Sequence, residues 1–324
     1  MKKILLALVL LFTIGSDIIA QQDVLFSQYM LSPLYYNAGS AGFDGVSHVS
    51  AIHRSQWLGY SSSFDGNGGA PSSQLISFSS PIKFQEKDLG LGVNIINDKL
   101  GAITNFNLEV AIAYHKKWRN GQLSIGIKPG VMLQTLDFSQ FRFNDSSDPL
   151  NIQSKESQFK PDLGFGIFYS KDDYTIGLGI NHLFNPSFDF GLDGIGNADF
   201  KNSIERNINI SGEYDYKVSY NLIFTPSILI KSDLNNYSFD LSGLFTYDEK
   251  IWGGISYRDS EAIILLMGYS FLEDNKMRVG YAFDYVVGEQ NAKQPTSHEI
   301  FIRYNLPGIS AGGRKIIRTP RFRF

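Results

Sequence analysis

The feature that most constrains this chain is an alternation of apolar and polar residues that recurs from Val46 onward. In the segment 103–117, Phe106, Leu108 and Val110 alternate with polar or small residues. Side chains two positions apart share one face of a β-strand. The alternation therefore predicts an all-β fold whose strands each have an apolar face and a polar face.

Turn-forming residues divide this region into about fourteen predicted strands. They cover 46–54, 73–82, 88–98, 103–117, 122–135, 159–170, 173–183, 204–216, 220–231, 236–247, 250–257, 262–271, 276–286 and 297–305. The long gaps, 55–72, 136–158, 184–203 and 287–296, all follow odd-numbered strands. The gaps after even-numbered strands, 83–87, 118–121, 171–172, 217–219, 248–249 and 272–275, are all short turns. In an up-and-down barrel every long loop would then lie at one end, as in outer-membrane barrels.

The pattern predicts a transmembrane antiparallel β-barrel over 46–305. The alternative is a soluble secreted sandwich or barrel, in which the apolar faces would share one core. The predicted strands are longer than the usual five to six residues. An aromatic-bearing apolar row recurs on nearly every strand, while the polar row is small and rich in glycine, as a crowded lumen would be. An even strand count further predicts that both termini lie in the periplasm.

The first twenty residues have the pattern of a secretory signal peptide. Lys2 and Lys3 precede an apolar run over 4–14, and Ala20 ends a small-residue site before Gln21. We predict a signal peptide over 1–20 with cleavage near Ala20. The apolar run is too short to cross about 30 Å of hydrocarbon, and no later run is long enough, so the mature chain is predicted to lack a transmembrane helix.

Composition excludes several functions. The chain has no cysteine, which rules out a disulfide, a thiolate metal site, a thiol nucleophile and a lipid anchor on an N-terminal cysteine. Its net charge of -3 gives no electrostatic basis for binding nucleic acid.

Residues 21–45 depart from the alternation. Pro33, Asn37 and Gly42 interrupt any regular element, yet the stretch 27–42 carries too much apolar surface for a solvated linker. We predict an irregular segment that folds into or across the lumen and plugs or caps the periplasmic end, or docks a partner there. The predicted plug or docking residues are Gln28, Tyr29, Pro33, Leu34, Tyr35, Asn37 and Gly42. The run from Ile263 to Met267 is apolar on both faces, so its inner face also needs a cover.

The polar row carries charges of both signs. The predicted lumen charges are Glu109, Lys128, Asp162, Arg258, Arg278, Asp284 and Glu299. They would either line a pore or form an internal network of salt bridges that fills the barrel. Arg54, Gln56 and Trp57 close the first strand, as a clamp on the following loop or as an interfacial aromatic with an extended arginine. The stretch 306–324 has basic but no acidic residues and is predicted to be a periplasmic tail that docks an acidic partner or remains disordered.

No catalytic or metal-binding pattern is present in the sequence. The motifs GxSxG and HExxH are absent, and His298 and Glu299 are adjacent, so their side chains point to opposite faces of a strand. We therefore predict no enzyme activity, no cofactor and no metal. The remaining alternative, a barrel hydrolase, would need a serine within reach of a histidine.

Several short motifs follow one another in a recognisable order. They are Phe26-Ser27-Gln28-Tyr29-Met30, Arg54-Ser55-Gln56-Trp57, Lys160-Pro161-Asp162-Leu163-Gly164-Phe165-Gly166, Gly254-Ile255-Ser256-Tyr257-Arg258, Gly280-Tyr281-Ala282-Phe283-Asp284-Tyr285, Ser297-His298-Glu299-Ile300 and Thr319-Pro320-Arg321-Phe322. In this order the chain resembles the PorP/SprF family of type IX secretion outer-membrane proteins from Gln21 to the C-terminus. It departs where the family often has Asn-Pro-Ala-Tyr-Ala-Gly, here 37–42, and where the family often has a cysteine, here Thr319.

The resemblance implies a non-enzymatic outer-membrane barrel in contact with membrane lipid. Such a protein would assist the secretion or surface attachment of a partner, commonly a large adhesin of the gliding type, or would bind periplasmic components of the secretion machinery. The alternative from a different class is a channel for small or hydrophobic solutes.

Overall fold

The computed structural model describes residues 23–60, 69–141, 155–190, 201–288 and 294–307. The predicted signal peptide over 1–20 lies outside the described residues. So does the predicted tail beyond residue 307.

Strands dominate the described chain. The helices are η1 (Tyr29–Leu31), α2 (Pro33–Tyr36), η2 (Ala38–Ser40), η3 (Phe138–Gln140) and η4 (Glu273–Asn275). The strands of the first half are β1 (His48–Ser55), β2 (Ser72–Phe84), β3 (Lys87–Leu100), β4 (Ile103–Trp118), β5 (Gly121–Asp137), β6 (Lys155–Lys171), β7 (Tyr174–Asn181), β8 (Ser187–Asp189) and β9 (Lys201–Ser203). Those of the second half are β10 (Asn207–Tyr214), β11 (Tyr216–Ser219), β12 (Leu222–Ser232), β13 (Tyr237–Tyr247), β14 (Ile251–Arg258), β15 (Ala262–Phe271), β16 (Met277–Val286) and β17 (Thr296–Asn305). None of the helices in the described ranges combines the length and the hydropathy that a membrane span requires.

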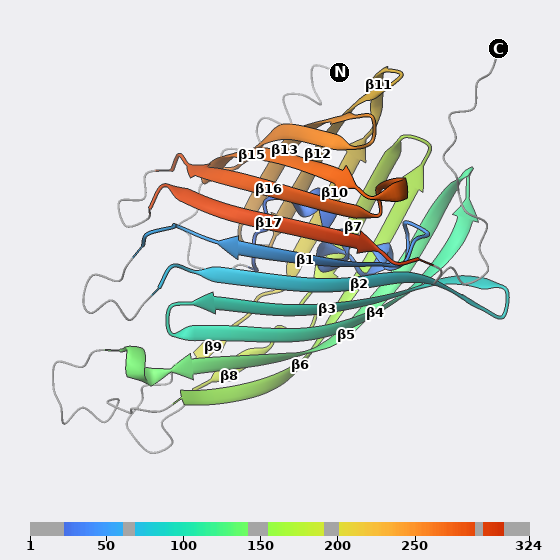
Figure 1. Ribbon diagram of the computed structural model, residues 1–324. Coiled ribbons are helices and arrows are strands. Elements are labelled where there is room, and N and C mark those ends of the chain that lie inside the picture. Colours follow the sequence, from blue (N-terminus) through green and yellow to red (C-terminus); the bar gives the residue numbers. More distant parts are fainter. Residues whose placement is uncertain (1–22, 61–68, 142–154, 191–200, 289–293, 308–324) are drawn as a thin grey trace, which may run out of the picture.

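The strands close into a ring in which sequential neighbours pair antiparallel (Figure 1). β1 pairs with both β2 and β17, and β10 pairs with both β7 and β12, so the barrel has no open edge. β11 continues the line of β10 against β12 in the same register, and the register shifts within β11, between Lys217 and Ser219. The predicted fourteen-stranded antiparallel barrel is confirmed. The predicted strand 204–216 forms as β10 and β11, and β8 and β9 add a small hairpin within the predicted loop 184–203, where no strand is predicted.

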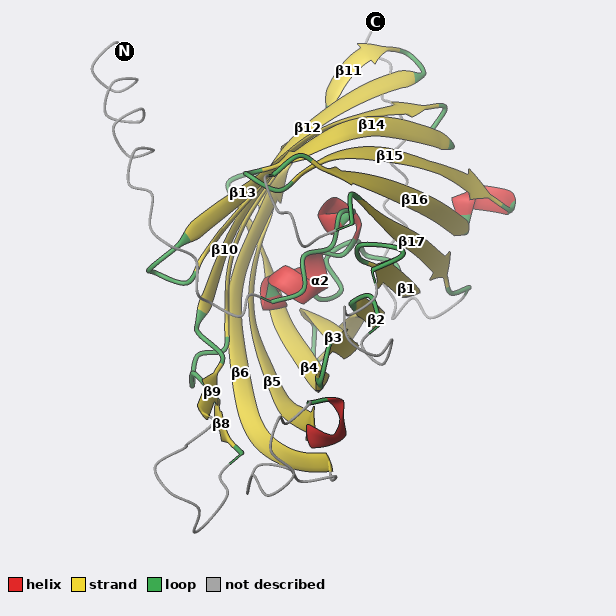
Figure 2. Cartoon of the chain, turned by 90° about the vertical axis from the view of Figure 1, so that its left-hand side faces the viewer, coloured by secondary structure: helices red, strands yellow, loops and turns green. Residues whose placement is uncertain are grey.

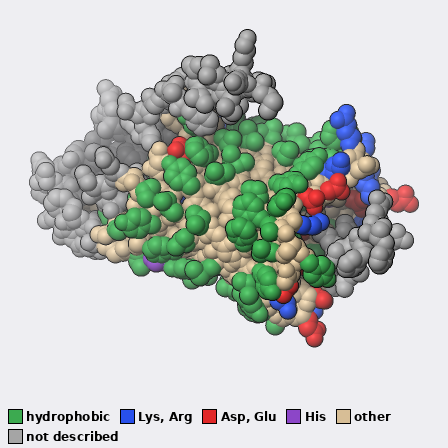
Figure 3. Space-filling view, turned by 90° about the horizontal axis from the view of Figure 1, so that it is seen from above, with side chains coloured by type: hydrophobic (Ala, Val, Ile, Leu, Met, Phe, Trp, Pro, Cys, Tyr) green, Lys and Arg blue, Asp and Glu red, His purple; other side chains and the backbone are tan. Residues whose placement is uncertain are grey.

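The period-two pattern separates a lipid-facing wall from a filled interior. On β4, Leu108, Val110 and Ile112 are exposed, whereas the intervening Glu109 and Ala111 are buried. Hydrophobic side chains cover much of the outer wall in Figure 3, and charged side chains gather at one end of it. An apolar exterior around a polar or packed interior is the arrangement of a membrane-spanning barrel.

The two ends of the barrel differ in their connections. We call the end that carries 56–71, 182–206 and 287–295 the long-loop end, and the opposite end the short-turn end. At the short-turn end the two-residue turns Gln85–Glu86 and Arg119–Asn120 have positive φ at both positions, which matches the twist of the flanking strands. The predicted sorting of long and short connections to opposite ends is therefore present.

The segment from Asp23 to Ser47 runs inside the barrel, where Figures 1 and 2 show η1, α2 and η2 surrounded by the strands. Asp23 lies at the long-loop end beside His182 and Asn207, and Asp44 lies near the short-turn end beside Arg303. The described chain thus begins at the end opposite to the one where β17 finishes. The segment thus lies in and across the lumen, and the prediction that both termini lie in the periplasm concerns residues outside the described ranges and stays a prediction. An even strand count fixes only where β1 begins, and the apolar segment before β1 turns back through the lumen.

A plugged lumen as the candidate functional site

One side of the lumen is apolar. The side chains of Phe26, Tyr29, Tyr35 and Tyr36 pack against inward residues of β1, β2, β3, β12 and β17, namely Ile52, Leu75, Ile96, Leu229 and Phe301. The ring of Tyr35 meets those of Phe26 and Tyr36 edge to face, with centroids 5.2 and 4.8 Å apart. Burial of one such side chain is worth about 1.5–3 kcal/mol. The apolar stretch therefore has its place of burial inside the barrel.

The opposite side of the lumen is a floor of glycines. A β-carbon at Gly90 would collide with the carbonyl oxygen of Ala41, and one at Gly179 with that of Tyr36. Gly126 lies similarly close to the backbone of residues 38–39, and Gly166 lies close to that backbone and to the Asn37 side chain. Because β3, β5, β6 and β7 carry no side chain at these points, the backbone of the segment rests directly on the wall. We name Gly90, Gly126, Gly166 and Gly179 the glycine floor.

The apolar strand predicted to need an inner cover has one. Ile264 and Leu266 are buried together with Ala262 and Ala282, and Met30 of the N-terminal segment packs against them. Ile263, Leu265 and Met267 face outward. The prediction for this strand is confirmed.

Buried charges of the wall hold the start of the segment. The carboxylate of Glu299 accepts hydrogen bonds from the backbone N–H groups of Ser27 (2.7 Å) and Gln28 (2.9 Å). The Ser27 hydroxyl donates to Asp284 at 2.8 Å and accepts from Arg54. Arg54 also pairs with Asp284 at 2.7 Å and with Glu299 at 3.5 Å. These partners are at most 1% exposed, so the interaction acts at low dielectric, where charge-assisted hydrogen bonds are strong.

A second charged group lies beside the first on β12, β13 and β14. Asp240 accepts from Lys231 and from Arg258, both at 3.0 Å. Arg258 also donates to the carbonyl oxygen of Phe26 at 3.3 Å, and the Tyr29 hydroxyl lies 2.9 Å from that of Ser227. The segment thus adds backbone and hydroxyl groups to an ion network whose charges are already paired with one another in the barrel wall.

Polar groups of the wall also bind the backbone of α2. Lys128 pairs with Glu109 at 2.9 Å and donates to the carbonyl oxygen of Tyr35 at 2.9 Å. The side-chain amide of Asn37 donates to the carbonyl oxygen of Ile167 at 2.9 Å. Irregular backbone inside a membrane barrel needs such partners, because each unpaired buried group costs free energy.

The structure places the predicted plug or docking residues inside the lumen. Gln28, Tyr29, Leu34, Tyr35 and Asn37 are each at most 7% exposed. Pro33 is half-buried, and Gly42 is buried against the backbone of Ser80 and Gly90. The position of these side chains fits a plug, and it leaves them little surface with which to touch another protein.

The predicted lumen charges fall into separate groups. Asp284, Glu299 and Arg258 belong to the network around Ser27, whereas Glu109 pairs with Lys128. Asp162 binds His182. Arg278 is half-buried and lies near Arg303 and Asp44 toward the short-turn end. The structure therefore pairs all of these charges except Arg278 with groups of opposite sign inside the barrel.

The clamp predicted for Arg54, Gln56 and Trp57 takes another form. Arg54 points into the lumen and bonds Ser27, Asp284 and Glu299, because it shares the inward face of β1 with Ile52. The following loop is held by backbone groups: Gln56 N–H donates to Pro71, and Trp57 N–H donates to the Ser297 hydroxyl. The sequence motif is thus split between the lumen and the loop.

Sequence reasoning missed Asp23, His182 and the glycine floor. Asp23 precedes the conspicuous stretch, and His182 follows β7, so neither falls on the alternating row. The floor had a signal in the sequence, since glycines occupy the polar row of β3, β5, β6 and β7. The lumen partner that each glycine contacts could not be inferred from that row.

His182 joins the start of the segment to the wall. Its ring nitrogens lie 2.8 Å from Asp162 and 2.8 Å from Asp23, and Asn207 donates to Asp23 at 3.0 Å. Burial alone would lower the pKa of His182, but the charges of Asp23 and Asp162 outweigh it and raise the pKa to about 10. Burial would likewise raise the pKa of Asp23, and the attraction of His182 lowers it instead. Asp23 and His182 therefore form a charged pair at neutral pH.

We expect this anchor to be lost at alkaline pH. A raised histidine pKa gives stabilisation that is complete below the ordinary value of 6.5 and disappears as the pH rises through about 10. Lys128 adds a further positive charge near Asp23. A fluorophore on the single cysteine of Gln22→Cys should show falling anisotropy over that range. His182→Gln should lower the anisotropy at neutral pH and remove the transition, whereas the exposed His53→Gln should leave both unchanged.

Two histidines lie near serines, which the hydrolase alternative requires. His115 is 2.5 Å from the Ser124 hydroxyl, and His53 is 3.2 Å from that of Ser55. His115 also lies against the backbone of Ala41, and Nδ1 of His53 faces the Gln74 amide, so within the described ranges neither ring has a carboxylate as its hydrogen-bond partner. Within the described ranges no group of three or more His, Asp and Glu side chains is arranged to hold a metal ion.

A closed antiparallel barrel with an apolar wall and a filled lumen defines this protein as a membrane β-barrel of the outer-membrane type. Residues 18–304 match the family described as type IX secretion system membrane protein PorP/SprF. The chain belongs to this family. A comparison with curated proteins gave no significant match.

Several solved structures have a similar fold. The toluene transporter TbuX of Ralstonia pickettii is 9% identical with a TM-score of 0.50, over 87% of this chain and 94% of that chain. A FadL homologue of Pseudomonas aeruginosa is 9% identical with a TM-score of 0.45, over 80% of this chain and 90% of that chain. The TodX deltaS2S3 mutant monoaromatic hydrocarbon channel is 10% identical with a TM-score of 0.47, over 87% and 95%. At these identities the similarity concerns the fold alone.

Proposed function

We propose that this protein is a non-enzymatic accessory component of type IX secretion that assists the secretion or surface attachment of a partner protein, such as a large adhesin. The long-loop end faces the outside in this proposal, and the short-turn end faces the periplasm. The observation that carries it is the filled lumen. A barrel whose interior is held by buried ion pairs, a glycine floor and an aromatic core is suited to present surfaces at its ends.

The long-loop end offers a structured surface for a partner. β6 pairs with β7 only from Phe165 onward, so its first ten residues extend beyond that neighbour. Together with β5 and the hairpin β8–β9 they enclose a second hydrophobic core of Met132, Leu136, Phe138, Phe188, Phe190 and Ile204. We assign the surface formed by these parts of β5, β6 and the β8–β9 hairpin to the binding of the partner.

Membranes of the native bacterium provide the test. After crosslinking, a C-terminally tagged protein should co-purify with a secreted surface protein or with secretion-machinery components. Replacement of 187–203 by a short glycine-serine linker should remove the surface protein while the barrel stays folded. Loss of the gene should leave that partner in the periplasm. Capture of neither class, or normal surface display without the gene, would contradict the proposal.

The other candidate, a channel for small or hydrophobic solutes, has less support in the lumen. The pocket at the long-loop end has a volume of about 30 Å³, enough for about two water molecules. A steady open conductance of the purified intact protein in planar bilayers would favour the channel over the plugged barrel.

A further inference from the structure

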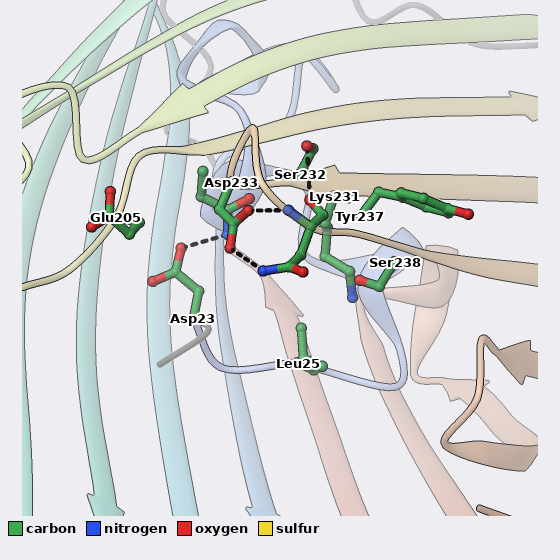
Figure 4. Close-up of a pocket in the computed structure, with 10 residues that line it drawn as sticks. Asp23, Leu25, Glu205, Lys231, Ser232, Asp233, Tyr237 and Ser238 are labelled. Atoms are coloured by element: carbon green, nitrogen blue, oxygen red, sulfur yellow. Dashed lines mark hydrogen bonds between the residues drawn. The ribbon is translucent and has the colours of Figure 1, made fainter. Parts of the chain in front are cut away.

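The described chain begins at the mouth of the long-loop end. Asp23 and Leu25 line a pocket there with Glu205 and with residues 231–233 and 236–238 of the β12–β13 hairpin (Figure 4). Asp23 is fixed from two sides, by His182 directly after β7 and by Asn207 at the start of β10. Both of these positions border the long connection 182–206.

From this mouth the segment descends through the barrel in the direction opposite to β1. Ser27 lies at the level of Arg54, near the end of β1, and Asn37 contacts Ile167, near the short-turn end of β6. Gly42 donates to Ser79, and Asp44 accepts from Arg303 two residues before β17 ends. The segment thus starts at the long-loop end and reaches the short-turn end before β1, with a local reversal at α2 that brings Tyr35 against Phe26 and Asn181.

We propose that the mature N-terminus is displayed at the long-loop mouth, on the face opposite to the C-terminal end of β17. Only Gln21 and Gln22 separate the predicted cleavage site from Asp23. Two residues span about 7 Å when fully extended, far less than the hydrocarbon thickness of about 30 Å. Once Asp23 is bound to His182, the new N-terminus cannot reach the other side.

The placement has a consequence for assembly. An exported chain arrives with its N-terminus in the periplasm, and a closed ring admits no segment through its wall. The backbone of the segment sits on the glycine floor without room for side chains between them. We therefore infer that the segment enters the lumen while the strands close around it. Its N-terminal end then forms part of the surface at the long-loop end.

Cysteine labelling on intact cells tests this placement, because the chain has no cysteine of its own. Gln22→Cys is compared with Leu58→Cys in a long loop and with Lys87→Cys at a short turn, using a membrane-impermeant maleimide before and after permeabilisation. Mass spectrometry of the purified variants verifies the mature N-terminus. We expect Gln22→Cys to label on intact cells as Leu58→Cys does. Labelling of Gln22→Cys only after permeabilisation while Leu58→Cys labels on intact cells, or no labelling of Gln22→Cys in folded protein, would overturn the proposal.

The controls keep this inference separate from the orientation proposed above. If Lys87→Cys labels on intact cells and Leu58→Cys does not, the barrel is inverted and the proposed orientation fails. The N-terminus inference would still hold if Gln22→Cys follows Leu58→Cys in both treatments. It fails if Gln22→Cys follows Lys87→Cys.

Discussion

Deletion of residues 24–44 is expected to convert a closed barrel into an ion-conducting pore. The purified intact protein should be nearly silent in planar bilayers, and the deletion should raise its mean conductance about tenfold or more, since a fourteen-stranded ring is too wide for wall side chains alone to fill. The wall should survive the loss. Asp240 binds Lys231 and Arg258 without the segment, and Glu109 binds Lys128.

Heat-modifiable migration in gels shows whether the deleted barrel is still folded, and a loop deletion that leaves 24–44 intact serves as the matched control. A folded but non-conducting deletion variant would mean that the loops seal the barrel, and the segment would then lose its role as the plug. An intact protein that already conducts would contradict the same interpretation.

Much of the barrel could be predicted because the side-chain pattern that sets it depends on residues close together in the sequence. Lipid on one side and a packed lumen on the other impose a period of two on each strand, and a slip by one residue would turn every side chain to the wrong face. Strand number, the sorting of connections and the plug-covered strand around Ile264 follow from that pattern. The same locality has a limit: adjacency in the sequence groups Arg54 with Trp57, whereas the strand turns the arginine into the lumen.

The interior was harder to predict because its contacts join distant parts of the chain. Ser27 binds Glu299, and Asp23 binds His182, across separations that no pattern in the sequence connects. The direction of the segment follows from these contacts and not from the strand count. Charged residues on the polar row indicated a network, but only the fold decides which of them are paired.

Replacing one glycine of the glycine floor with a larger residue is expected to displace the segment 23–47 from the barrel wall without deleting it. A leucine at Gly166 would place side-chain atoms where Asn37 and the backbone of residues 38–39 now lie. Overpacking of this kind costs about 1–3 kcal/mol, and backbone atoms cannot yield as a flexible side chain can. Gly166→Leu should therefore raise conductance in bilayers and make 23–47 sensitive to added protease. Gly69→Leu is the matched control, because its β-carbon would meet open space. If both variants behave like the intact protein, the floor does not hold the segment, and the seal would depend on the ion network around Ser27 instead.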